Sequence, residues 1–143
     1  MDKVTTLKQS PLLSALEDRQ LQGLASVAKE RHFDAGDKLI TAGTKGGLAM
    51  FVLMSGRVEI SRDGVAIGEL GPGAHVGEMA VLGPDDMLRS ADVIAAEPTV
   101  VLQVTRWDLY PYLKANPDAA LVIINELAGR LAAADEKLAS QGR

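Results

Sequence analysis

The feature that most constrains the fold is the regular spacing of glycine turns between Phe33 and Thr105. Short runs of strand-forming residues alternate there with turn signals about every 8–12 residues, a spacing typical of antiparallel sandwiches and rolls. Asp63-Gly64 in particular is a strong signal for a two-residue hairpin. We expect strands over Lys38–Ile40, Ala49–Met54, Arg57–Ser61, Val65–Leu70, Ala91–Ala95 and Thr99–Thr105.

Helices are predicted on both sides of this region. Leu21, Leu24, Ala25 and Ala28 fall at i, i+3, i+4 and i+7, which predicts a helix that ends near Arg31. Leu12, Leu13 and Leu16 indicate a shorter apolar turn before it.

After the strands, Arg106–Leu113 can form a short helix. Asn116-Pro117-Asp118 then supplies an N-cap, a proline at the first helical position and an acid in the first turn. That signal predicts a long helix ending near Ser140. The expected fold is mainly β with flanking helices, an antiparallel jelly-roll-like β-roll in one domain over 1–143. Its parts are helical 10–31, the β-roll 32–105 and C-terminal helices 106–140.

Composition excludes several classes of function. The 143 residues are 47% apolar with a net charge of −4 and no cysteine, so we expect a globular domain without disulfides or thiolate metal sites. The negative charge argues against a nucleic-acid surface, and no apolar run is long enough to span a membrane. We therefore expect a cytoplasmic protein.

The two histidines, His32 and His75, are too few for a cupin-type metal centre, and no other catalytic cluster is evident. We expect no enzyme activity and a structural role for His75.

The segment 71–91, GPGAHVGEMAVLGPDDMLRSA, carries the residues best suited to binding chemistry. Four of its residues are glycines, which turn the backbone sharply or let it approach a ligand. Residues Glu78–Leu82 can form one helical turn whose first amides face an anion. Arg89 adds a planar guanidinium suited to phosphate, and Ser90 adds a hydroxyl. The set suits a ribose phosphate, although from spacing alone a solvated surface turn is the simpler interpretation.

The chain resembles the cyclic-nucleotide-binding domains of the catabolite-activator and kinase-regulatory-subunit superfamily. The resemblance covers roughly Pro11 to Leu138. It includes Phe33-Asp34-Ala35-Gly36-Asp37, Leu53-Met54-Ser55-Gly56-Arg57-Val58, Leu70-Gly71-Pro72-Gly73, Gly77-Glu78-Met79-Ala80 and Arg89-Ser90-Ala91.

This resemblance implies the roles of the site residues. The ligand would be cyclic AMP or cyclic GMP, and the short helix after Gly77 would be its phosphate-binding helix. Gly77 and the amides of Glu78, Met79 and Ala80 would hold the cyclic phosphate, and Glu78 would also accept the ribose 2′-hydroxyl. The guanidinium of Arg89 would pair with the phosphate, with hydrogen bonds from Ser90 and the Ala91 amide. Arg130 matches an arginine that lies near the ligand's acid partner in the activators, although a solvent-facing position is an open alternative.

Three departures from the family pattern bear on whether binding is retained. The loop Gly83–Leu88 is longer than usual and holds Asp85 and Asp86, and Val76 stands where an aromatic residue is usual. The final helix has Ala134 and Asp135 where the activators place hydroxyl residues against adenine. A degenerate module that binds no nucleotide and serves in dimerisation or docking is therefore the alternative function, and a changed ligand is a third.

The last helix is the expected output device. Its apolar residues recur at alternate spacings of four and three, a period suited to helix pairing, at Ala120, Ile124, Leu127, Leu131, Ala134 and Leu138. We expect the first two turns of this stripe to pack on the roll, and the turns beyond Leu127 to extend past it. The resemblance points to a homodimer through this helix, or to a separate effector protein. The activators' helix-turn-helix is absent, so we expect no direct DNA binding.

Overall fold

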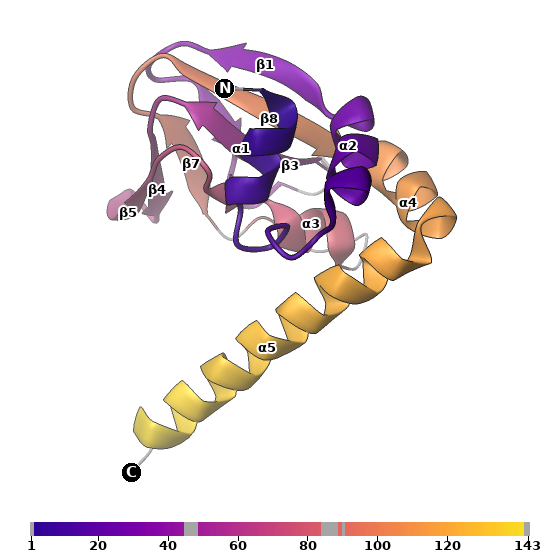
Figure 1. The fold of residues 1–143 in the computed structure, drawn as a ribbon. Helices are drawn as coiled ribbons and strands as arrows, with labels where there is room; N and C mark the ends of the chain where they lie inside the picture. The colour runs from indigo at the N-terminus through magenta and orange to yellow at the C-terminus, as the bar shows by residue number, and fades with distance from the viewer. Residues whose placement is uncertain (1, 45–48, 84–88, 90, 142–143) are drawn as a thin grey trace.

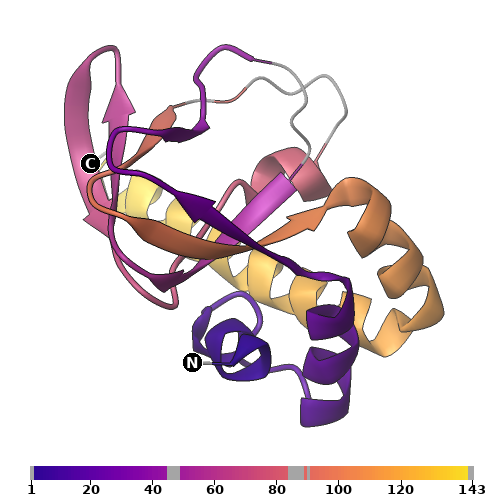
Figure 2. The same cartoon turned by 90° about the horizontal axis from the view of Figure 1, so that it is seen from above.

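The computed structural model describes residues 2–44, 49–83, 89 and 91–141. Two four-stranded antiparallel sheets form a roll with helices at one side (Figures 1 and 2). The strand orders are β1-β8-β3-β6 and β2-β7-β4-β5. The strands are β1 (Lys29–Phe33), β2 (Lys38–Ile40), β3 (Ala49–Ser55), β4 (Val58–Arg62), β5 (Val65–Leu70), β6 (His75–Val76), β7 (Asp92–Ala95) and β8 (Thr99–Thr105).

Five helices flank the sheets in the described part of the chain. They are α1 (Lys3–Gln9), α2 (Asp18–Val27), α3 (Glu78–Leu82), α4 (Arg106–Ala115) and α5 (Pro117–Gln141). The expected mainly β architecture with flanking helices, a short helix after Gly77 and a long last helix is confirmed. The Asp63-Gly64 hairpin is confirmed too, because both residues have positive φ, at 54° and 78°.

The sequence of β3 is an almost continuous run of apolar residues. Its first five residues are all buried, because both faces of the strand are covered. Phe51 and Leu53 point between the two sheets, where Phe51 meets Phe33 edge-to-face at a centroid distance of 6.0 Å. Met50 and Val52 point to the other face, where the helices pack.

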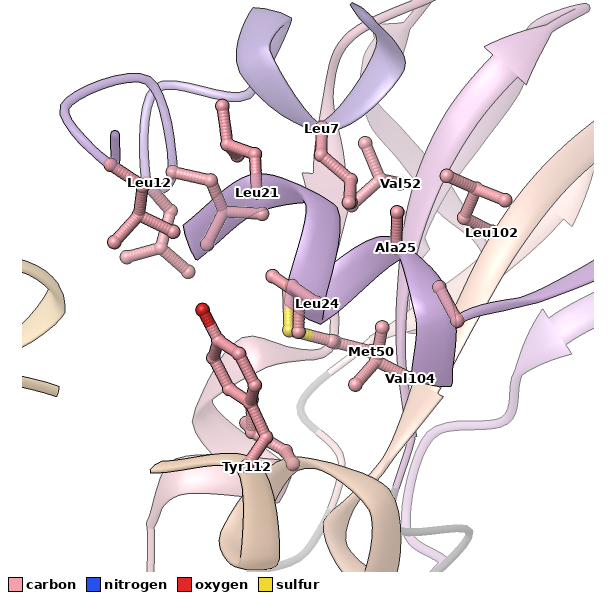
Figure 3. Close-up of a cluster of buried hydrophobic side chains, with 14 of the residues drawn as sticks. Leu7, Leu12, Leu21, Leu24, Ala25, Met50, Val52, Leu102, Val104 and Tyr112 are labelled. Atoms are coloured by element: carbon pink, nitrogen blue, oxygen red, sulfur yellow. The ribbon is translucent and has the colours of Figure 1, made fainter. Parts of the chain in front are cut away.

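A second cluster of buried apolar side chains, drawn in Figure 3, packs the helices against the face of β3 that carries Met50 and Val52. The predicted helix face Leu21, Leu24, Ala25 and Ala28 is buried in this cluster. Tyr112 of α4 lies against it, and its hydroxyl donates to the backbone oxygen of Gln20 at 2.7 Å. This bond fixes α4, and through it the start of α5, to the N-terminal helices.

Two features of the N-terminal region were predicted wrongly. The helix does not continue to Arg31, since α2 ends at Val27 and β1 begins at Lys29. β1 pairs with β8 along its whole length, and this pairing outweighs the polar, helix-compatible sequence KERH. An additional helix, α1, precedes residue 10, and the Asp2 side chain caps it by accepting from the Thr5 amide.

The long helix α5 crosses beneath the roll and then runs away from it (Figure 1). Ala119 and Ile123 are buried against the helical layer, whereas Ile124 is 58% exposed. The stripe predicted to pack on the roll is therefore wrong by one position in its first two turns. Residues 131–140 are all exposed, so the predicted extension past the roll is confirmed.

Candidate functional site

The turn at Gly77 begins the site. The preceding strand β6 pairs with β3, and the chain then turns at Gly77 in a left-handed conformation with φ 85° to start α3. A Cβ at this position would lie 2.8 Å from the Ala49 carbonyl oxygen and 3.0 Å from Nη1 of Arg89. Both the backbone conformation and the close approach require glycine here.

Arg89 occupies the other side of this turn. Its side chain is almost fully covered, with the residue 9% exposed. Nη2 donates to the Ala49 carbonyl oxygen at 3.0 Å, and Nη1 donates to the Gly77 carbonyl oxygen at 3.4 Å. Burial lowers the pKa of the guanidinium, while the charge of Glu78 acts in the opposite direction. A buried guanidinium beside a glycine turn is a suitable binding partner for an anion.

Glu78 is the first residue of α3 and follows the turn directly. Its carboxylate oxygen Oε1 lies 3.8 Å from Nε2 of His75, and its side chain is 22% exposed. An ionised carboxylate accepts hydrogen bonds and cannot donate them. Glu78 therefore offers acceptors to hydroxyl groups directly after the turn that Arg89 contacts.

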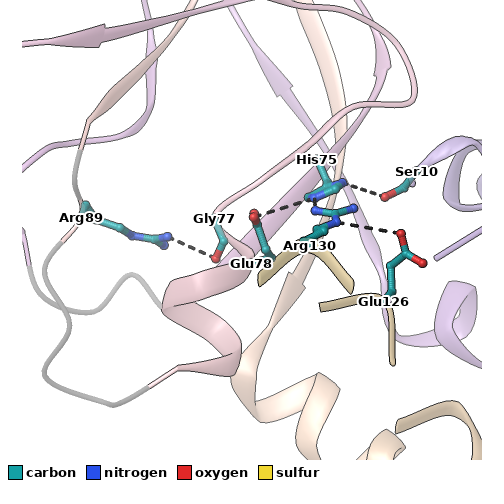
Figure 4. Close-up of polar contacts among 7 residues, drawn as sticks. All are labelled: Ser10, His75, Gly77, Glu78, Arg89, Glu126 and Arg130. Carbon is teal, nitrogen blue, oxygen red and sulfur yellow. Dashed lines mark hydrogen bonds and ion pairs between the residues drawn. The ribbon is translucent and has the colours of Figure 1, made fainter. Parts of the chain in front are cut away.

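His75 connects this carboxylate to two distant parts of the chain (Figure 4). Its Nδ1 lies 2.9 Å from Oγ of Ser10, and its Nε2 lies 3.1 Å from Nη1 of Arg130 on α5. Arg130 in turn pairs with Glu126 one turn earlier, with Nε and Oε1 separated by 4.0 Å. Burial lowers the pKa of His75, and Arg130 lowers it further, whereas Glu78 raises it.

Comparison with known proteins shows to which family this domain belongs. Residues 30–116 match the family model of the cyclic nucleotide-binding domain. The chain belongs to this family. Its fold is also that of the N-terminal domain of a transcriptional regulator from Streptomyces coelicolor, at a TM-score of 0.82 and 28% identity over 92% of this chain and 95% of that one.

Two curated relatives are considerably longer than this chain. It is 35% identical to glutaminase 2 of Bradyrhizobium diazoefficiens over 92% of the chain, and spans 21% of that protein's length. It is 31% identical to the cyclic AMP receptor protein of Thermus thermophilus, over 92% of the chain and 62% of that protein. The match to the family model, over residues 30–116 of this chain, falls within the part that it shares with the glutaminase.

The cyclic nucleotide-binding domain gathers most of the predicted site residues. Gly77, Glu78 and Arg89 lie around one turn, and Met79 and Ala80 continue α3. Ala91 is buried just before β7, while Ser90 and the loop residues 84–88 lie outside the described residues. Arg130 is half-buried and reaches the site through His75, rather than facing solvent.

Two participants were not predicted from the sequence. We expected a structural role for His75, and no pattern links it to Ser10, 65 residues away, or to Arg130, 55 residues away. The role of the Ala49 carbonyl could not be predicted from the sequence either, because every residue has a backbone oxygen. The only available signal was the i, i+3 spacing of His75 and Glu78.

An apolar recess of about 210 Å³ lies between α3 and α5. It is lined by Glu78, Met79, Leu82, Gly83 and Leu127. The two helices are thus incompletely packed against each other beside the ribose-binding candidate Glu78. In the described part of the chain, no helix is long and apolar enough to cross a membrane.

Proposed function

We propose that this chain is a single, non-catalytic regulatory domain that binds cyclic AMP or cyclic GMP and transmits occupancy through α5. The observation that carries the proposal is the buried guanidinium of Arg89 beside the Gly77 turn, with Glu78 as the residue that follows this turn. A cyclic nucleotide presents one phosphate anion and one free ribose hydroxyl, which need these two complementary groups. The name of the Thermus relative, a cyclic AMP receptor protein, favours the adenine nucleotide.

In this proposal, different residues bind different parts of the nucleotide. The phosphate lies against Gly77, the amides of Glu78, Met79 and Ala80, and the guanidinium of Arg89. Ser90 and the Ala91 amide add hydrogen bonds to it. Glu78 accepts the ribose 2′-hydroxyl, and Arg130 contributes from α5 through His75.

Signalling through α5 is supported by how loosely this helix is held. Its first turns are buried at Ala119 and Ile123, but it borders an apolar recess at α3 and is exposed from residue 131 onward. A ligand that contacts α3 can therefore favour one placement of α5 over another. We propose that α5 pairs with a second copy of the chain or with an effector protein, and that the protein acts in the cytoplasm.

A degenerate module without a ligand is the second candidate. The observation that favours it is that Arg89 already donates to the carbonyl oxygens of Ala49 and Gly77. These bonds stabilise the buried guanidinium without any anion. In this case the exposed apolar side of α5 alone would carry the function, as a docking surface.

Calorimetric titration with cyclic AMP and cyclic GMP, with 5′-AMP as a non-cyclic control, tests the proposal. We expect one cyclic nucleotide to bind the wild type, and Arg89→Ala to weaken it. Removing one partner of a buried charge pair costs about 2–5 kcal/mol, or roughly 30-fold or more in Kd.

The matched control is Arg19→Ala, which removes an exposed arginine of α2 whose partner is Glu17 at 3.5 Å. Its affinity should stay within about twofold of wild type, as is usual for surface positions. Absence of binding by the wild type would favour the degenerate module. Binding by a folded Arg89→Ala protein at wild-type affinity would contradict the role of Arg89.

A further inference from the structure

His75 lies where three separate parts of the molecule meet. It belongs to β6, directly before the Gly77 turn, and its side chain is only 8% exposed. One ring nitrogen contacts Ser10, in the segment after α1, and the other contacts Arg130 of α5 and faces Glu78 of α3. No other histidine is available to do this, since His32 lies exposed on β1.

The contacts determine where the proton on the imidazole lies. A guanidinium only donates hydrogen bonds, so Nε2 of His75 accepts from Arg130 and carries no proton. The proton of the neutral ring is therefore on Nδ1, which donates to Oγ of Ser10. Both nitrogens are satisfied only in this neutral tautomer.

A second proton would reverse the contact at Nε2. The protonated nitrogen cannot accept from Arg130, whereas the carboxylate of Glu78, 3.8 Å away, can accept from it. Among the described residues, the charged groups that face the ring are Glu78 from α3 and Arg130 from α5, with Glu126 behind Arg130. The contact from the α1 side is the hydroxyl of Ser10. Burial and Arg130 lower the pKa of His75 and thus keep the ring neutral near pH 7.

We propose that His75 is a positioning residue that, when neutral, accepts from Arg130 and so holds this side chain of α5 at the ring that faces the ribose-binding carboxylate Glu78, and that its protonation weakens nucleotide binding by engaging Glu78 and releasing Arg130. The proposal rests on the proposed function for its ligand. The protonated ring and the ribose 2′-hydroxyl compete for the same carboxylate. Acid therefore opposes binding, and nucleotide binding opposes protonation, because linkage is reciprocal.

Affinity for cyclic AMP measured at two pH values tests this coupling. We expect the wild type to bind more weakly at about pH 5 than at about pH 8, and the loss to grow as the pH falls toward the lowered pKa of His75. His75→Gln retains an acceptor for Arg130 and a donor for Ser10 but cannot take up a proton, so its affinity should be the same at both pH values. His32→Gln, the matched control, should keep the wild-type pH dependence. A His75→Gln protein that shows the full wild-type dependence would overturn the proposal.

A second measurement needs no nucleotide and separates this proposal from the proposed function. Nitrogen-15 NMR of the imidazoles in the nucleotide-free chain should show His75 protonated on Nδ1 near pH 7, with a pKa below the ordinary histidine value because the ring is buried. Arg130→Met removes both the donor to Nε2 and the nearby positive charge, so the pKa of His75 should rise. A His75 ring protonated on Nε2, or unaffected by Arg130→Met, would refute the link to α5. Failure of every cyclic nucleotide to bind, with the NMR result as expected, would refute the proposed function alone.

Discussion

A side chain at position 77 would meet atoms on three sides. Besides the Ala49 oxygen and Nη1 of Arg89, its Cβ would lie 3.2 Å from Cδ1 of Ile40. The site is therefore built by bringing the backbone close to Arg89, and the absence of a side chain is what allows it. Two separate costs apply to any substitution here, the left-handed backbone and the steric overlap.

Gly77→Ala should both destabilise the fold and weaken nucleotide binding. The left-handed conformation costs an L-residue roughly 1–2 kcal/mol, and displacement of Arg89 and the Ala49 backbone adds to it. Gly64→Ala is the matched control, because Gly64 has φ 78° with nothing within 4 Å of the added Cβ. Denaturant unfolding and calorimetry should show a larger stability loss for Gly77→Ala, and lost affinity for it alone. Equal losses at both glycines would mean that the overlap with Arg89 is relieved at little cost.

Glu78 should make the site discriminate ribose from deoxyribose. Its carboxylate accepts a hydrogen bond only when a 2′-hydroxyl donates one, and hydrogen bonds to charged groups contribute about 1.5–3 kcal/mol. We expect 2′-deoxy cyclic AMP to bind the wild type roughly tenfold more weakly than cyclic AMP. On Glu78→Gln the same change of ligand should have a much smaller effect.

The measurement is a double-mutant cycle by calorimetry with the two ligands and the two proteins. The coupling between the substitution and the missing hydroxyl is the quantity of interest. Simple additivity of the two losses would indicate that Glu78 does not contact the ribose.

At the residue scale, the sequence was sufficient for groups whose chemistry is local. Gly77 and Glu78 are adjacent, and Arg89 follows in the same segment, so one motif contained all three. The link from Ser10 through His75 to Arg130 joins residues from three distant elements. Tertiary packing brings these three residues together, so their positions along the chain do not predict the contact.

At the element scale, the predicted strands were those with a strong apolar pattern or clear turns. β1 was missed because four of its five residues are exposed and polar, which is typical of an edge strand protected from aggregation. The two-residue β6 is too short to give any period. The face of α5 was misassigned because its first half is apolar on more than one side, with Leu121 and Ile124 exposed and Ala119 and Ile123 buried. A period alone cannot decide between adjacent apolar faces.

A buried hydrogen bond joins α2 to α4, beside their shared apolar packing. The Tyr112 hydroxyl donates to the Gln20 carbonyl oxygen at 2.7 Å, and its ring lies 3.1 Å from the position of a Cβ on Gly23. Burial raises the pKa of Tyr112, so the hydroxyl remains a donor at neutral pH.

Tyr112→Phe should lower the free energy of unfolding by about 1 kcal/mol, since it removes one hydrogen bond and leaves the ring in place. Tyr110→Phe is the matched control in the same helix, because Tyr110 is half-buried and contacts Arg106 through its ring face, which phenylalanine retains. Denaturant unfolding of both variants provides the comparison. If both proved equally stable, α4 would be held by apolar packing without the Tyr112 bond.

At the scale of the whole molecule, α5 is an element with most of its length uncovered. Leu131 and Leu138 are 64% and 66% exposed on its free half, and Leu121 and Ile124 are exposed on the half that packs against the roll. These four residues recur at spacings of three or seven, so they share one face of the helix. A run of large apolar side chains on one face marks an interaction surface. A second copy of the chain would cover it by pairing α5 with α5.

Leu131→Asp combined with Leu138→Asp should give a folded monomer from a homodimeric wild type. Both residues lie beyond the roll, so the substitutions remove the pairing face without opening the core, and circular dichroism should be unchanged. Light scattering with and without cyclic nucleotide measures the assembly state. Because the same helix carries Arg130, which contacts His75 beside Glu78, we expect pairing and binding to influence each other, so the monomer should bind nucleotide with altered affinity. The matched control is Lys137→Asp, which changes charge on the exposed helix without removing an apolar residue and should stay dimeric. A monomeric wild type would refute the pairing, whereas a monomeric variant with wild-type affinity would show that α5 joins two chains without carrying the signal.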